Sequence, residues 1–191
     1  GTGDTGYFTL HDARAVGKNA GMIAAIGAVS SNGMIGLNGW LPWDIPEELA
    51  YFEAMVAGAA LVIGRLTYES MDVVPVDSFV VTSQRDLVLK PGCQAVESVE
   101  KALLTATETG KHVFVIGGAA LYATAWPYCQ CFYLTRIERE FDGDCCFPES
   151  IPLADWRVLD EQRKTYIERN SGLATVCRFI QYEQGNPLQL G

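Results

Sequence analysis

The sequence of 191 residues has few basic residues, few histidines and no long apolar run. Lysine and arginine number 14 against 23 acidic residues, which gives a net charge of −9. This excess of negative charge argues against nucleic acid and anionic membranes as partners. The longest apolar runs, such as residues 57–63 with an internal glycine, are too short to cross a bilayer. We therefore expect a soluble, cytoplasmic protein with no membrane partner.

Patterns that bind metals or phosphates through a known motif are also missing. The six cysteines include no CxxC pair, and the spacings at Cys129/Cys131 and Cys145/Cys146 fit tetrahedral zinc poorly. With only two histidines in the chain, no metal is expected. Free thiols in a reducing compartment are the favoured interpretation, with a structural disulfide as the alternative. The chain has neither GxGxxG nor a P-loop.

Short apolar runs alternate with helical patterns along the chain. We expect strands at 22–29, 60–63, 78–82, 113–116 and 131–137, and helices at 66–71, 99–107 and 119–125. Continuously apolar strands alternating with helices predict a parallel sheet that is covered on both faces. Later, 157–159 and 164–169 look like strands, and the turn Asn170-Ser171-Gly172 precedes the alternating 173–182.

The expected fold class is therefore α/β, with a mainly parallel central sheet, helices on both faces and an antiparallel C-terminal hairpin. Residues 1–21 show little periodicity and are expected to be a flexible leader. One domain is expected over 22–183, followed by a loose tail over 184–191.

One carboxylate stands in the apolar stripe of a predicted helix. Asp44 can cap this helix, and Glu47 can complete the capping box. Four apolar residues recur at helical spacing and are expected to face inward: Ile45, Leu49, Phe52 and Val56. Glu48 lies on that same surface, whereas Glu47 points away. Two interpretations stay open: a helix-start carboxylate satisfied by backbone amides or water, or a carboxylate held for a ligand with paired donors.

Three predicted strand ends carry groups that can hold phosphate. Gly64 and Gly117-Gly118 each follow a strand and precede a helix, at the sheet edge where ligands bind. Glycine allows close approach, and a helix N-terminus presents free N–H groups to an anion. Arg65 adds a guanidinium. A third turn adds two hydroxyls and a second guanidinium: Thr82, Ser83 and Arg85. Each could be an ordinary turn, but together they favour a dinucleotide.

The connection over residues 30–40 holds three glycines among apolar side chains. A mobile loop of this composition suggests a lid over a site, and an ordinary long connection is the alternative.

The order of these blocks across residues 22–182 resembles the dihydrofolate reductase family. The matching stretches are Ile26-Gly27-Ala28-Val29, Gly33-Met34-Ile35-Gly36, Leu41-Pro42-Trp43, Glu48-Leu49, Phe52, Gly64-Arg65-Leu66-Thr67-Tyr68-Glu69-Ser70-Met71, Val115-Ile116-Gly117-Gly118-Ala119-Ala120-Leu121-Tyr122, Leu134-Thr135-Arg136-Ile137, Asp142-Gly143-Asp144 and Phe147-Pro148. The resemblance implies a single reductase domain, here a monomer, that reduces 7,8-dihydrofolate to tetrahydrofolate by hydride transfer from NADPH to the pterin ring.

The resemblance also implies roles for individual residues. Glu48 matches the carboxylate that grips the pterin, Thr135 supports that contact, Leu41 closes over the nicotinamide, and Tyr122 lies near the hydride path. The implied substrate-binding residues are Glu48, Tyr122, Thr135, Ile26, Gly27, Ala28, Leu49, Phe52, Ser70, Met71 and Ile116. The implied cofactor-binding residues are Ala28, Ile35, Gly36, Gly64, Arg65, Leu66, Thr67, Thr82, Ser83, Arg85, Ile116, Gly117, Gly118, Ala119, Ala120, Leu121 and Tyr122. Arg65, Thr82, Ser83 and Arg85 match the region that binds the adenosine 2′-phosphate.

One stretch departs from the family. A Leu-Pro-Gly-Arg segment normally supplies an arginine for the α-carboxylate of the folate tail, but here Val76 or Asp77 falls at that position. Losing such a partner costs about 1.5–3 kcal/mol. Low folate affinity, a substitute basic residue and a different pterin substrate all stay open. The rival functions are a reductase of the same fold that acts on another pterin or a pyrimidine, and a dinucleotide- or pterin-binding module without turnover.

Overall fold

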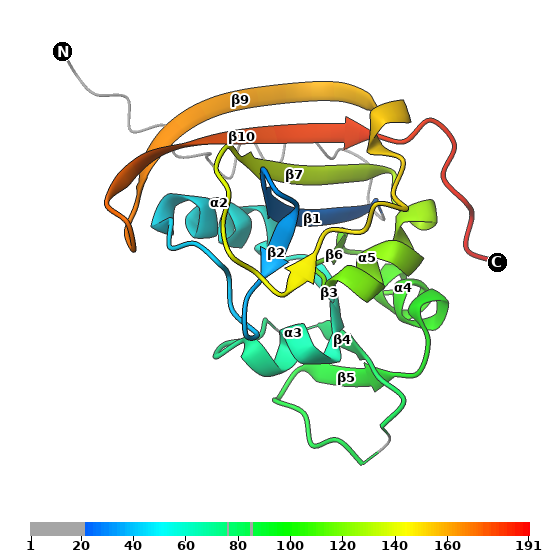
Figure 1. Ribbon diagram of the computed structural model, residues 1–191. Coiled ribbons are helices and arrows are strands. Elements are labelled where there is room, and N and C mark those ends of the chain that lie inside the picture. The colour runs from blue at the N-terminus through cyan, green and yellow to red at the C-terminus, as the bar shows by residue number, and fades with distance from the viewer. Residues whose placement is uncertain (1–21, 76, 85) are drawn as a thin grey trace.

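An eight-stranded sheet forms the centre of the computed structural model, which describes residues 22–75, 77–84 and 86–191. The predicted leader, residues 1–21, lies outside the described residues. The strand order is β5-β4-β3-β6-β1-β7-β10-β9 (Figure 1). The strands are β1 (Ile23–Ser30), β3 (Ala60–Gly64), β4 (Ser78–Val81), β5 (Cys93–Val96), β6 (Val113–Val115), β7 (Cys131–Ile137), β9 (Arg157–Glu168) and β10 (Leu173–Glu183).

The pairing of these strands confirms the predicted fold class. From β5 to β7 in the sheet order every pair is parallel, while β10 runs antiparallel to both β7 and β9. The C-terminal hairpin therefore extends one edge of an otherwise parallel sheet. Because the parallel strands share one carboxyl edge, their end turns meet there.

Helices cover both faces of the sheet, as predicted. On one face, Ala25 of β1 shares a buried cluster with residues of α4 (Val99–Thr107) and α5 (Ala119–Ala125). On the other face, Ile26 shares a second cluster with residues of α2 (Pro46–Val56) and α3 (Arg65–Ser70). Neighbouring residues of a strand point to opposite faces. Short 3-10 turns follow at η1 (Trp126–Tyr128) and η2 (Leu153–Asp155).

The edge strand β9 corrects one expectation. Residues 157–159 and 164–169 were predicted as separate strands, but β9 is continuous from Arg157 to Glu168. The stretch between them, residues 160–163, is charged and polar. It remains in the strand because β9 is an edge strand with most of its side chains exposed, where charged residues are common.

A two-stranded sheet was not predicted at all. It pairs β2 (Met34–Gly36), which lies in the connection expected to form a lid, with β8 (Cys145–Cys146). Gly143 makes this pairing possible, because a Cβ there would lie 2.8 Å from the Gly36 carbonyl oxygen. The connection is thus tied to a segment that follows it by more than a hundred residues.

The C-terminal segment, expected to be loose from residue 184, contacts the domain along η1. The Gln184 Nε2 atom donates to the carbonyl oxygens of Trp126 and Cys129, and the Leu188 N–H donates to Pro127. All six cysteines are free thiols. Within the described part of the chain, no helix is long and apolar enough to span a membrane.

Candidate active site

The two glycine turns predicted from the sequence lie side by side at the carboxyl edge of the sheet. The Gly64 N–H donates to the Gly117 carbonyl oxygen over 2.8 Å. A Cβ at Gly64 would lie only 3.2 Å from that oxygen. The absence of a side chain at Gly64 therefore lets the two backbone segments approach each other closely. Gly117 has a φ of +104° and is joined to Gly118 by a cis peptide bond. The turns at the ends of β3 and β6 thus form one continuous backbone surface.

Tyr122 spans the gap between this surface and β1. Its hydroxyl donates to the Ile26 carbonyl oxygen over 2.6 Å, and a Cβ at Gly27 would lie 2.5 Å from the same hydroxyl. Burial, followed by the charge of Glu48, raises the pKa of Tyr122 strongly. The Tyr122 hydroxyl therefore stays protonated and acts as a donor. The same hydroxyl lies beside Gly117, where a Cβ would be 3.0 Å from it.

Glu48 is buried, with 5% of the residue exposed. The side chain points to the interior as the helical spacing predicts. Glu47 is half-buried and its Oε2 atom is buried, so the prediction that Glu47 points away is wrong for that atom. Desolvation raises the pKa of Glu48 from 4.5 to about 7, and the nearby Trp43 indole offsets part of this rise. Near neutral pH the carboxyl group is therefore close to its midpoint of protonation.

Three buried polar atoms on this side of the sheet have no hydrogen-bond partner within the described residues: Trp43 Nε1, Glu47 Oε2 and Thr135 Oγ1. The Trp43 indole is close enough to lower the pKa of Glu48, but it makes no hydrogen bond of standard geometry. Thr135 pairs with Phe179 of β10, whose ring packs on Tyr51 of α2 at 4.6 Å. Thr135 thus lies on the face that α2 covers. Buried polar groups are normally paired, so these atoms point to a ligand or water.

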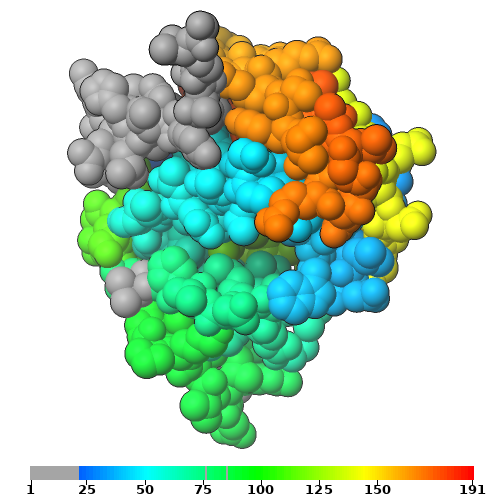
Figure 2. All heavy atoms as spheres, turned by 90° about the vertical axis from the view of Figure 1, so that its left-hand side faces the viewer, coloured from blue at the N-terminus to red at the C-terminus, as the bar shows by residue number. Residues whose placement is uncertain are grey.

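Apolar residues assigned to the substrate pocket mostly gather on the same face. Ile26 and Ile116 are buried there, and Ala28, Phe52 and Met71 pack against them. Leu49 is 45% exposed, so the prediction that it faces inward is wrong. Figure 2 shows α2 (cyan) and α3 (green) on either side of a recess, with residues near 40 (blue) beside it. The Ser70 hydroxyl donates to the Thr67 carbonyl oxygen of its own helix.

The start of α2 also differs from the prediction. Asp44 does not cap the helix: the N-cap is Ile45, and no side chain caps it. The Asp44 N–H instead donates to the buried carboxylate of Glu168, over 2.9 Å. The local sequence pattern could not predict the contact between Asp44 and Glu168, because 124 residues separate them.

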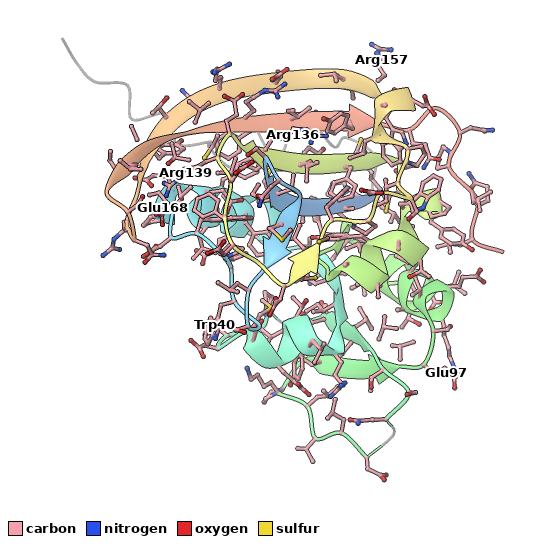
Figure 3. The ribbon with its side chains drawn as sticks, in the orientation of Figure 1. Trp40, Glu97, Arg136, Arg139, Arg157 and Glu168 are labelled. Carbon is pink, nitrogen blue, oxygen red and sulfur yellow. The ribbon has the colours of Figure 1, made fainter. Side chains whose placement is uncertain are left out.

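The predicted lid contains a tight hairpin. Leu37 and Trp40 exchange two backbone hydrogen bonds, and Asn38 and Gly39 both have positive φ, as a two-residue hairpin turn requires. Trp40 and Leu41 are 65% and 48% exposed, and Figure 3 shows Trp40 near α3. The Ile35 side chain packs against the core on the α4/α5 face.

The remaining cofactor residues lie around the two glycine turns. Leu66 and Thr67 belong to α3, and Ala119, Ala120 and Leu121 to α5. The Arg65 guanidinium pairs with Glu69 over 3.1 Å. Thr82 and Ser83 follow β4, and the Thr82 hydroxyl accepts from the Gln84 N–H. Arg85 lies outside the described residues. Gly64, Gly117 and Gly118 present backbone without side chains at this edge, which fits close approach of a dinucleotide.

Other residues lie where the family normally has the arginine that binds the folate tail. Val76 lies outside the described residues. Asp77 has a φ of +61° and pairs with the Lys111 ammonium. Lys90, which was not predicted as a site residue, donates through Nζ to the Met71 and Asp72 carbonyl oxygens. It therefore brings a cation to the segment that follows α3.

A mainly parallel α/β sheet with a glycine-lined carboxyl edge is typical of one class of proteins, the nucleotide-binding α/β proteins. The sequence pattern of the family described as dihydrofolate reductase matches residues 22–184. The chain belongs to the dihydrofolate reductase family, whose members are oxidoreductases that use NADPH.

Individual members of the family match this chain over most of their own length. Dihydrofolate reductase of Bacillus subtilis is 36% identical over 172 residues, covering 89% of this chain and 99% of the relative. Dihydrofolate reductase HdrB of Haloferax volcanii is 32% identical, covering 90% and 88%. The solved structure of dihydrofolate reductase from Enterococcus faecalis, complexed with NADP(H) and RAB-propyl, aligns with a TM-score of 0.77 at 30% identity, covering 87% and 98%.

Proposed function

We propose that this chain reduces 7,8-dihydrofolate to tetrahydrofolate with NADPH, and that Glu48 is the group that binds the pterin. The observation that carries the proposal is a buried carboxylate on the same face of the sheet as two unsatisfied polar atoms, Trp43 Nε1 and Thr135 Oγ1. A pterin offers two adjacent N–H donors that match the two oxygens of a carboxylate. On binding, the pterin N–H groups would therefore replace the hydrogen bonds to water that Glu48 lost on folding.

The raised pKa of Glu48 suits the chemistry of this reduction. The ring nitrogen next to the carbon that accepts hydride must gain a proton. A desolvated carboxyl group with a pKa of about 7 favours the protonated form of a substrate held against it. Glu48 thus orients the ring and keeps a proton available, and water completes the path to the ring nitrogen.

The glycine surface would hold the cofactor. NADPH, when bound, supplies the hydride. Gly64, Gly117 and Gly118 allow its close approach, and Arg65 offers a guanidinium fork to the adenosine 2′-phosphate. Tyr122 remains protonated beside Gly117 and contacts the middle of β1 through its hydrogen bond to Ile26. Leu41 is the side chain proposed to close over the nicotinamide.

The test of this proposal is Glu48→Gln, which keeps the shape of the side chain and removes its charge. We expect turnover at pH 7 to fall by about 10²–10⁴, the usual size of an acid–base contribution, with the Kd for NADPH unchanged. Glu53→Gln, an exposed carboxylate of the same helix, is the matched control. An equal loss of turnover and NADPH binding would contradict the assignment.

We further propose that Lys90 substitutes for the missing tail arginine. Lys90 precedes β5, whose first residue, Cys93, pairs with Ser78, the neighbour of Asp77. Its ammonium group contacts main-chain carbonyls of 71 and 72 and lies 5.6 Å from the centre of the Tyr68 ring. These contacts orient the cation without neutralising it, so it can meet a carboxylate.

Comparing dihydrofolate with a tail-less dihydropterin tests this assignment. Lys90→Met should raise KM for dihydrofolate about tenfold, the scale of a charged hydrogen bond, and leave KM for the tail-less pterin unchanged. Asp77→Arg should lower KM for dihydrofolate only. Equal kinetics of the wild-type protein on both substrates would instead favour a different pterin as substrate. The monomeric state is a further prediction, tested by light scattering, and cytoplasmic location stays a prediction.

A further inference from the structure

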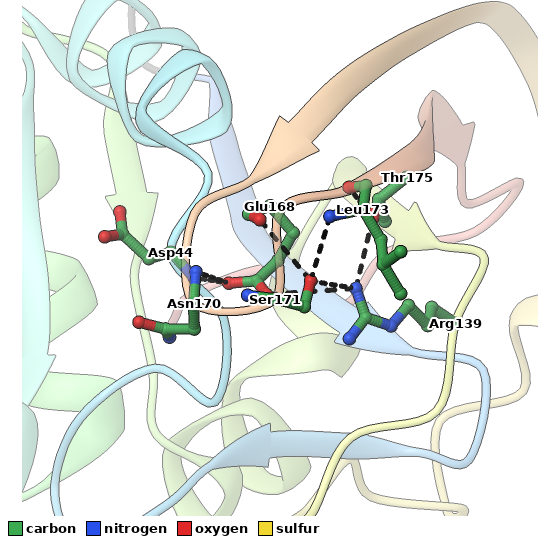
Figure 4. A network of polar contacts seen from close by, with 7 residues as sticks. All are labelled: Asp44, Arg139, Glu168, Asn170, Ser171, Leu173 and Thr175. Atoms are coloured by element: carbon green, nitrogen blue, oxygen red, sulfur yellow. Dashed lines mark hydrogen bonds and ion pairs between the residues drawn. The ribbon is translucent and has the colours of Figure 1, made fainter.

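The carboxylate of Glu168 is buried at a junction that lies outside the candidate active site. Its side chain, at the end of β9, is 1% exposed. One carboxylate oxygen, Oε2, accepts from the N–H groups of Asp44 and Asn170 over 2.9 and 3.1 Å. The other, Oε1, accepts from the Ser171 N–H over 2.9 Å. The same carboxylate thus joins the β9–β10 turn to the segment that leads into α2 (Figure 4).

A second line of contacts runs from Glu168 to Trp43. The Arg139 guanidinium lies 3.8 Å from Glu168 Oε1 and donates to the Ser171 hydroxyl over 2.8 Å. The same guanidinium stacks 4.8 Å above the Phe141 ring, and this ring meets Trp43 edge-on at 5.6 Å. Figure 3 shows Arg139 and Glu168 beside the start of α2. The indole beside Glu48 is therefore held from this junction.

Both oxygens of Glu168 are needed as acceptors. Desolvation raises the pKa of Glu168, but the hydrogen bonds from Asp44, Asn170 and Ser171 outweigh it, so the pKa is lowered and the charge persists. A glutamine amide in its place has only one oxygen that can accept from these backbone N–H groups. Its NH₂ group would face the N–H donors on the other side without bonding to them. An aspartate would be one methylene too short to reach Asp44 while it holds the turn.

We propose that Glu168 is a positioning residue: its carboxylate fixes the Trp43–Asp44 segment, and so sets the start of α2 and the direction in which Glu48 points. The inference rests on the proposed role of Glu48 as the pterin-binding group. The first turn of α2 has no side-chain cap, so this distant carboxylate does the anchoring. The Asp44 backbone is held on both sides, because its carbonyl oxygen accepts from the Arg169 N–H over 2.8 Å.

The experiment compares Glu168→Gln and Glu168→Asp with a matched control on the same strand, Glu161→Gln. Glu161 pairs with Arg178 and its side chain is 38% exposed. Glu168→Gln should raise KM for dihydrofolate about tenfold, leave Kd for NADPH within about twofold, and lower kcat less than it raises KM. Glu168→Asp should not restore KM. Glu161→Gln should behave as the wild-type protein.

A purely structural role predicts a different result. It would reduce the fraction of folded enzyme, and hence kcat, with KM for dihydrofolate unchanged; that outcome overturns the proposal. The folded fraction is measured by urea unfolding of each variant. In the Trp43→Phe background, Glu168→Gln should have a much smaller effect on KM, because both changes release the same segment. Full additivity of the two changes would also overturn it.

The two proposals can fail separately. If Glu48→Gln leaves turnover unchanged, the proposed binding of the pterin by Glu48 is wrong. If Glu48→Gln abolishes turnover but Glu168→Gln leaves KM for dihydrofolate unchanged, Glu48 keeps its role and only the positioning by Glu168 is refuted.

Discussion

Replacing Glu48 with glutamine should make the ligand-free protein more stable at alkaline pH. The pKa of Glu48 is raised from 4.5 to about 7 by burial, so between these pH values the folded chain keeps a proton that the unfolded chain releases. The free energy of unfolding therefore falls as pH rises through this window. At about 1.4 kcal/mol per tenfold change in proton affinity, the total penalty is about 3 kcal/mol. Glutamine avoids it, because the amide carries no charge.

Urea unfolding at pH 5 and pH 8.5 measures this effect. The Glu48→Gln protein should gain about 2.5 kcal/mol relative to the wild type on going from pH 5 to pH 8.5, because part of the total penalty is already present at pH 5; the slope against urea should be unchanged. The exposed control Glu53→Gln should show the same difference from the wild type at both pH values. A Glu48→Gln protein whose relative stability does not depend on pH would show that Glu48 is solvated, and the reasoning about its site would be refuted.

Three further substitutions test separate parts of the site. Gly27→Ala should cost about 1–3 kcal/mol of stability, because its Cβ would press on the Tyr122 hydroxyl at 2.5 Å; Tyr122→Phe in the same chain should relieve much of this, and no relief would disprove the contact. Arg65→Ala should weaken NADPH about tenfold more than NADH, measured by fluorescence titration, and an unchanged ratio would clear Arg65 of contact with the 2′-phosphate. Thr135→Val removes a buried hydroxyl without a partner in the described structure, so stability should rise by about 1 kcal/mol while KM for dihydrofolate rises; a fall in KM would contradict its role.

Segments with strong local signals were predicted to the residue. The bounds expected for α4, α5 and β7 agree with those of the structure. Each of these is a short apolar or amphipathic run, so the local pattern alone defines it. The meeting of Gly64 and Gly117 was predictable too, because parallel strands place their ends at one edge.

Features that depend on distant partners could not be predicted in the same way. The β2–β8 pairing contains only short strands, whose pattern is too brief to read. The local capping box suggested Asp44 as N-cap, but tertiary contacts with Glu168 and Arg169 use the Asp44 backbone instead. The exposure of Leu49 escaped prediction for a related reason. Helical spacing places Leu49 on the apolar side of α2. The spacing does not show how much of that side the packed core covers, and the core does not cover Leu49.

The candidate active site is built from groups that the fold leaves unsatisfied. A buried polar atom without a partner costs about 1–3 kcal/mol. Trp43 Nε1 and Thr135 Oγ1 are two such atoms, on the same face of the sheet as the desolvated carboxyl group of Glu48. Anything that satisfies these groups recovers their cost as binding energy. The affinity for the pterin ring should therefore exceed what its apolar contact area supplies, and an analogue without the 2-amino group should lose more affinity than one hydrogen bond is worth. Because such an analogue would leave Glu48 buried beside an unmatched ring edge, its binding should also weaken further as pH rises above 7 and the carboxyl group loses its proton.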